Sequence, residues 1–100
     1  MIELYDIIDA ANYPFKNGML VLHKSMKIHP KFKMYKQFCY NLYYINGDNK
    51  TSVLDYEETK TVATDNIEEV WNEYDKAYLV KFIKWLTSDD YKSIVENDVQ

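Results

Sequence analysis

The chain has 100 residues, 47% of them apolar, with 12 lysines, 16 carboxylates, no arginine and a formal net charge of −4. This length fits a single domain with one core, and the apolar fraction excludes extended disorder. The charges are unevenly distributed: the first fifty residues carry seven lysines against four acids, and the last fifty carry five lysines against twelve acids. The acidic total and the absence of arginine argue against a dedicated nucleic-acid-binding domain, which is usually basic.

Cysteine usage and hydropathy favour a soluble cytoplasmic protein with no membrane partner. Cys39 is the only cysteine and cannot form an internal disulfide, which is typical of a reducing compartment. The opening segment 2–11 is interrupted by acids and does not resemble a leader, and the longest apolar run, 77–86, contains two lysines. Lysine, tyrosine, asparagine and isoleucine make up thirty-eight residues. Because their codons are AT-rich, we expect an AT-rich genome, such as that of a low-GC bacterium, a phage or a plasmid.

The first predicted element is a short amphipathic helix over residues 2–11, where apolar residues recur at helical spacing. Pro14 ends it, since the residue before a proline is disfavoured in helical geometry. Asn17-Gly18 then indicates a turn, and the apolar run 19–24 predicts a strand.

Residues 31–45 fit two interpretations. Their aromatic residues follow both a helical stripe and an alternating strand pattern, and the high aromatic content favours the strand. The tetrapeptide 46–49, Asn-Gly-Asp-Asn, indicates a hairpin turn that leads into a strand over 53–62. We therefore predict a β-meander over 19–63, with a helix at 31–45 as the alternative.

The final third predicts a long amphipathic helix over residues 65–86. Asp65 and Glu68 have the spacing of a capping box at its start, and apolar residues then recur along one face. Ser88 is placed to cap a short terminal helix. The fold class that follows is α+β, comprising a short helix, a small antiparallel meander, a long helix and a short terminal helix; a mostly α chain is the alternative.

No catalytic residue, metal site or cofactor is predicted. His23, His29 and Cys39 have no recognised metal-ligand spacing, and Gly18 and Gly47 are too isolated to form a phosphate-binding loop. We therefore expect a protein that is not an enzyme.

Two charged segments are candidate binding sites. The segment 16–44 is rich in lysine and aromatic residues, a composition that suits single-stranded nucleic acid, because lysines contact phosphates and aromatic rings stack on bases. Its candidate residues are Lys24, Lys27, Lys31, Lys33, Tyr35 and Lys36. A lysine-covered solvent face is the simpler interpretation, so nucleic acid is the less favoured partner.

The acidic segment 55–75 holds eight acids and one lysine, with aromatic residues between them that can anchor an interface. Its candidate partner-binding residues are Asp55, Tyr56, Glu57, Glu58, Asp65, Glu68 and Glu69. We therefore expect a small acidic binding or inhibitory protein, encoded by a phage or mobile element. Its expected partner is a larger protein with a basic surface, either a nucleic-acid-handling host or defence protein or a toxin that it neutralises. Self-association remains open.

Overall fold

A computed structural model describes residues 3–98 of the chain. Three helices and a three-stranded sheet follow one another in the order expected for an α+β fold. The elements are α1 (Leu4–Ala11), β1 (Met19–Ile28), β2 (Tyr35–Asn46), β3 (Asn49–Thr61), a 3₁₀ turn η1 (Thr64–Asn66), α2 (Ile67–Trp85) and α3 (Asp89–Asp98). Residue 2, where the first helix was expected to begin, lies outside the described residues.

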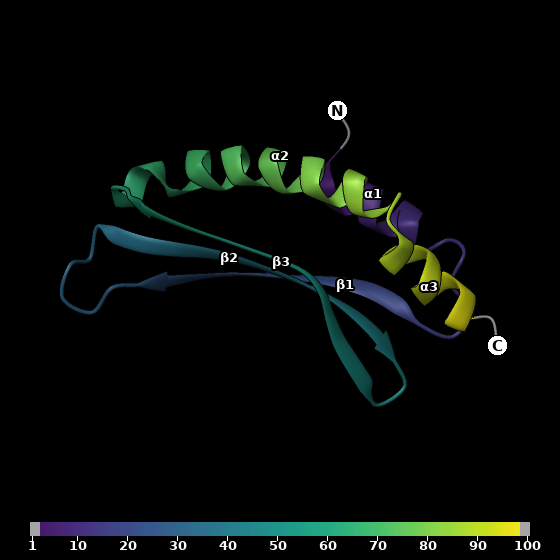
Figure 1. The fold of residues 1–100 in the computed structure, drawn as a ribbon. Coiled ribbons are helices and arrows are strands. Elements are labelled where there is room, and N and C mark those ends of the chain that lie inside the picture. Colours follow the sequence, from purple (N-terminus) through teal and green to yellow (C-terminus); the bar gives the residue numbers. More distant parts are fainter. Residues whose placement is uncertain (1–2, 99–100) are drawn as a thin grey trace.

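The sheet is an antiparallel meander in the order β1-β2-β3, so β2 is the central strand. The strand interpretation is therefore correct from Tyr35 onward, residues 31–34 lie in the loop before β2, and the helical alternative is wrong. The β2–β3 hairpin turns at Gly47-Asp48, where Gly47 has a φ of 62°. Only the first central residue has positive φ, which is the geometry of a type II′ turn and matches the right-handed twist of the strands. All three helices lie on one side of the sheet, and none of the described residues covers its other face (Figure 1).

The core lies between the sheet and α2. Alternate residues of β2 point toward the helices, and Phe38, Tyr40 and Leu42 are completely buried. From α2, Tyr78 and Phe82 fill the space opposite them; Tyr78 stacks on Tyr40 at a centroid distance of 4.8 Å. A buried phenol needs a partner for its hydroxyl, and the Tyr78 hydroxyl donates to the Leu54 carbonyl at 2.9 Å. Two of the ten tyrosines thus form the centre of the core.

The start of α2 differs from the predicted one. Asp65 lies in η1, the helix begins at Ile67, and Asn66 occupies the N-cap position without a side-chain capping bond. The capping box expected for Asp65 and Glu68 is therefore absent. The Ser88 cap is confirmed, since its hydroxyl accepts a bond from the Tyr91 N–H at 3.3 Å. Within residues 3–98, no helix has the length and apolar character needed to cross a membrane.

Candidate functional site

The fold converts the uneven charge along the sequence into a charge difference between two layers. The helices, with their caps and η1, lie in segments 3–12 and 63–98, which carry twelve acids and four lysines, a net charge of −8. Segment 13–62, which forms the sheet and its loops, carries eight lysines and four acids, a net charge of +4. A basic partner is therefore attracted to the helical side of the molecule.

Three of the predicted partner-binding residues lie in this acidic layer. Asp65 is exposed in η1, and Glu68 and Glu69 are exposed in the first turn of α2, where the helix dipole favours negative charge. Glu73 follows Glu69 by four residues, so these two side chains lie on the same exposed face. Glu73 also forms an exposed ion pair with Lys60 of β3 at 3.4 Å.

Glu58 and Tyr56 lie at the seam between β3 and α2. Glu58 is exposed there and accepts a bond from the Tyr56 hydroxyl at 3.1 Å. Tyr56 itself is half-buried against Tyr40, Tyr74 and Tyr78. Burial raises its pKa, and the neighbouring Glu58 raises it further. The structure therefore places Tyr56 at the edge of the core, with its ring only partly exposed.

Asp55 and Glu57 lie on the other face of the sheet, away from the helices. Side chains alternate along β3, and these two contact polar neighbours on the open face of β2. Asp55 accepts a bond from Asn41 at 3.1 Å, and Glu57 accepts one from Gln37. The structure thus divides the predicted acidic site between two faces, because strand alternation separates residues that are adjacent in sequence.

The acidic layer also exposes three large apolar side chains that the sequence interpretation did not assign to a binding surface. Tyr5 of α1 and Val80 and Ile83 of α2 are 48%, 55% and 49% exposed. Val80 and Ile83 continue the exposed face of α2 on which Glu69 and Glu73 lie. The signal in the sequence was the presence of apolar residues at positions 80 and 83, on the otherwise polar face of the predicted helix.

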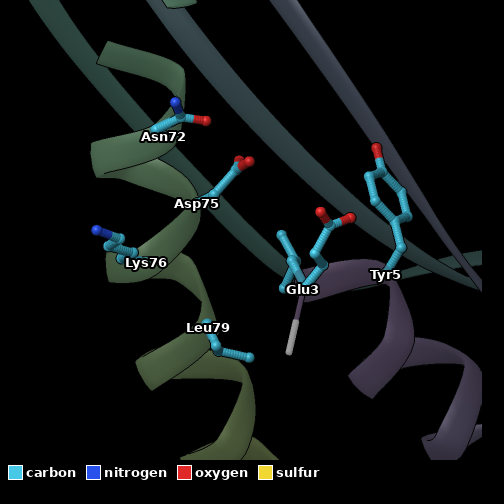
Figure 2. Close-up of a pocket in the computed structure, with 7 residues that line it drawn as sticks. Glu3, Tyr5, Asn72, Asp75, Lys76 and Leu79 are labelled. Carbon is cyan, nitrogen blue, oxygen red and sulfur yellow. The ribbon is translucent and has the colours of Figure 1, made fainter. Parts of the chain in front are cut away.

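A pocket of about 410 Å³ lies between the start of α1 and the middle of α2 (Figure 2). Its lining residues are Glu3, Leu4, Tyr5, Asn72, Asp75, Lys76 and Leu79. The Asp75 carboxylate points toward α1, where Glu3 and Tyr5 form the facing wall (Figure 2). The pocket therefore combines apolar walls with polar groups that can orient a bound side chain.

Lys24 of β1 approaches the Asp75 carboxylate to 2.8 Å, and its ammonium lies 4.8 Å from the centre of the Trp71 ring. Tyr40 also donates its hydroxyl to Asp75, and burial together with this bond raises the Tyr40 pKa. Lys24 thus balances the charge of Asp75 beside the pocket, whereas the Lys76 side chain points away from Glu3 (Figure 2). Acids near the pocket, such as Glu3 and Glu73, attract a basic surface.

The six residues predicted for nucleic-acid binding form two groups in the structure. Lys24 is held by Asp75 and aromatic rings, and Lys36 is 3% exposed, with its ammonium donating to the Lys33 and Val62 carbonyls at 2.8 Å. Neither of these two ammonium groups is free to contact a phosphate. The exposed residues of the set are Lys27, Lys31, Lys33 and Tyr35, at one end of the sheet.

Residues 3–98 contain no cluster of three or more His, Cys, Asp or Glu side chains placed to bind a metal ion. Cys39 is buried on the central strand, 7% exposed. Comparisons with models of known protein families, with curated proteins and with solved structures find no match to this chain.

Proposed function

We propose that this protein is a small, non-enzymatic binding protein whose helical side docks on a basic surface of a larger protein. The observation that carries the proposal is the net charge of −8 on the helical layer, opposite a sheet with a net charge of +4. Such a difference orients an approaching basic partner toward α1 and α2 and away from the sheet.

The arrangement of side chains on this layer supports the same interpretation. Protein interfaces commonly have an apolar centre and a polar rim, and a few side chains in central pockets provide most of the affinity. Here Tyr5 lines the pocket and is partly exposed, and Val80 and Ile83 are exposed on the face of α2 that also carries Glu69 and Glu73. We therefore expect an apolar or aromatic side chain of the partner to enter the pocket, while basic groups around it face the acids.

The class of partner follows from this chemistry. A surface that combines exposed acids with exposed apolar side chains resembles neither a nucleic-acid site nor a catalytic cleft, and it complements a basic groove in a protein. We propose a nucleic-acid-handling enzyme or a basic toxin as the partner, which the protein inhibits by covering that groove. The expected AT-rich origin suits a phage or another mobile element as the source.

The decisive experiment compares charge reversals of equal size on the two faces. The wild type, E69K/E73K and D55K/E57K are immobilised and exposed to lysate of a low-GC bacterial host, and the captured proteins are identified and quantified. We expect one basic protein to be captured by the wild type and by D55K/E57K, and its capture to fall at least about tenfold with E69K/E73K.

Both variants change the net charge by the same amount, so a general charge effect alters both alike. Circular dichroism and thermal unfolding verify that each variant is folded. Equal loss of capture with both variants, or loss with D55K/E57K alone, would contradict the assignment of the helical side.

A further inference from the structure

One end of the molecule has an exposed apolar and basic loop that the proposed helical interface does not use. This tip loop connects β1 to β2 and, with the adjoining strand ends, covers residues 28–35. Four of the nine exposed large apolar side chains among the described residues lie in it: Ile28, Phe32, Met34 and Tyr35, which are 48–61% exposed. Lys31 and Lys33 alternate with them and are also exposed. Such a concentration of apolar surface in eight residues marks an interaction site.

The tip loop is held in one conformation by its own hydrogen bonds. The Nδ1 atom of His29 accepts bonds from the backbone N–H groups of Lys31 and Phe32 at 3.1 and 3.0 Å. The Tyr35 N–H donates to the Phe32 carbonyl at 2.8 Å, and the His29 ring lies 5.2 Å from the Phe32 ring. The exposed rings are therefore presented by an ordered loop, which reduces the entropy lost when they are buried in an interface.

The same end of the molecule carries exposed acids. The Val62 N–H donates to the Met34 carbonyl at 2.7 Å, so the chain leaving β3 runs beside the tip loop. Asp65 and Glu68 follow within six residues, and Figure 1 shows the start of α2 above the tip loop at this end. Among the described residues the ion pairs are Lys24–Asp75 and Lys60–Glu73, so Lys31 and Lys33 do not pair with these acids within one copy.

We propose that this end is a docking surface for a second copy of the chain. In a two-fold symmetric dimer, a first patch on one copy contacts a second patch on the other copy. The symmetry then requires that the second patch of the first copy contacts the first patch of the other. Here the lysines of one tip loop face Asp65 and Glu68 of the other copy, and the apolar side chains of the two tip loops meet near the axis. Both patches lie on one end of the molecule, which is the arrangement that such a two-fold contact requires.

The dimensions of the molecule limit the strength of this dimer. It measures 49 × 31 × 18 Å, so its end has a cross-section of about 560 Å² per copy. Stable complexes bury roughly 800 Å² per partner. The dimer is therefore weak and concentration-dependent, and although it covers Asp65 and Glu68, it leaves the pocket and the exposed Val80 and Ile83 free for another protein.

A second copy fits this end better than an anionic polymer or membrane does. Phosphate groups that approach Lys31 and Lys33 also approach Asp65 and Glu68, and the like charges repel one another. A second copy satisfies both sets of charges at once.

The test uses reciprocal charge reversals. K31E/K33E makes the whole end acidic, and D65K/E68K makes it basic, so each variant alone should dimerise at least about tenfold more weakly than the wild type. An equimolar mixture of the two restores both contacts, and the quadruple variant restores them within one chain at the wild-type net charge. Sedimentation velocity from about 1 µM to about 1 mM protein measures each case, a range that covers weak association.

We expect concentration-dependent dimers for the wild type, the mixture and the quadruple variant, and much weaker association for each double variant alone. A wild type that remains monomeric at the highest concentration would overturn the proposal, as would dimers unaffected by either double variant. Labelled oligo(dT) and phosphatidylglycerol vesicles are tested in parallel. Binding of either one by the monomer, lost in K31E/K33E, would instead assign the tip loop to nucleic acid or to an anionic membrane.

Discussion

At the scale of single residues, Asp98 shows how a charged group can connect distant segments. It is 2% exposed, yet its carboxylate accepts bonds from the backbone N–H groups of Lys16 and Asn17 and from the Tyr44 hydroxyl. Burial favours the neutral acid, but these bonds outweigh it and lower the Asp98 pKa. Burial and the nearby carboxylate raise the pKa of Tyr44 to about 12. Asp98 thus joins the end of α3 to the loop before β1.

This linkage predicts the pH dependence of stability. A carboxyl with a lowered pKa in the folded state stabilises the fold above its unfolded pKa of about 3.9, and this contribution is lost as the pH falls through the folded pKa. The D98N variant should therefore have a lower melting temperature than the wild type at pH 7, and the difference should shrink below about pH 4. Thermal unfolding of the two proteins from pH 2.5 to 7 measures the difference in melting temperature and its change with pH.

Glu96 provides the matched control, since it is exposed in the same helix and E96Q removes the same charge. We expect E96Q to follow the wild type across this pH range. If the melting temperature of D98N is lower than that of the wild type by the same amount at every pH, the charge of Asp98 does not contribute to stability, and only its shape and hydrogen bonds do.

Lys36 has a structural role that the amino-acid composition of its segment does not indicate. In the sequence it is one of six lysines in the basic segment 16–44, and it alternates with the apolar Phe38, Tyr40 and Leu42. In the structure it shares their strand face, buried, and its ammonium satisfies two backbone carbonyls. An apparent binding residue is therefore a structural one, because a long side chain can bury its methylene groups and still place its charge against acceptors.

At the scale of elements, α2 organises the fold. Its buried positions, Val70, Tyr78, Phe82 and Trp85, recur at helical spacing and face the sheet. Alternate residues of β2 point toward α2 and pack against these helical side chains. The helical period of α2 and the two-residue period of β2 therefore place apolar side chains in the same core layer. This agreement between local pattern and tertiary contact explains why the helix was predictable.

We predict that F82A reduces the free energy of unfolding by roughly 3–5 kcal/mol, because a completely buried ring is replaced by a cavity. This is a large part of the 5–15 kcal/mol typical of a small domain. K76A, on the exposed face of the same helix, should change it by less than about 0.5 kcal/mol. Urea titration followed by tryptophan fluorescence measures both, and an F82A variant as stable as the wild type would contradict the observed register.

At the scale of the whole molecule, the charge difference between layers makes a kinetic prediction. Long-range attraction mainly raises the association rate, whereas a buried apolar anchor mainly slows dissociation. For the basic partner, E69K/E73K should slow association roughly tenfold at low ionic strength and reduce its salt dependence. I83S should instead speed dissociation, since Ile83 is one of the exposed apolar side chains of the helical side.

Surface plasmon resonance at several salt concentrations separates these effects. D55K/E57K serves as the control and should associate at close to the wild-type rate, because these residues lie on the opposite face of the sheet. An association rate that falls equally for both charge-reversal variants would show that net charge, rather than the placement of the acids, controls the encounter.

The sequence by itself determined the order of the elements and the type of the helices, because an amphipathic helix leaves a distinct periodicity and the Asn-Gly turn marks the hairpin. For residues 31–45 it left strand and helix open, and only the pairing of β2 with β1 and β3 decided between them. The sequence also determined that lysines and acids are segregated along the chain. The tertiary structure decided which charges act together. Strand alternation places Asp55 and Glu57 on one face and Tyr56 and Glu58 on the other, and the meander brings the tip loop beside the start of α2. The reason is that local pattern sets the direction of a side chain relative to its own element, whereas the neighbours it meets depend on how elements distant in sequence pack together.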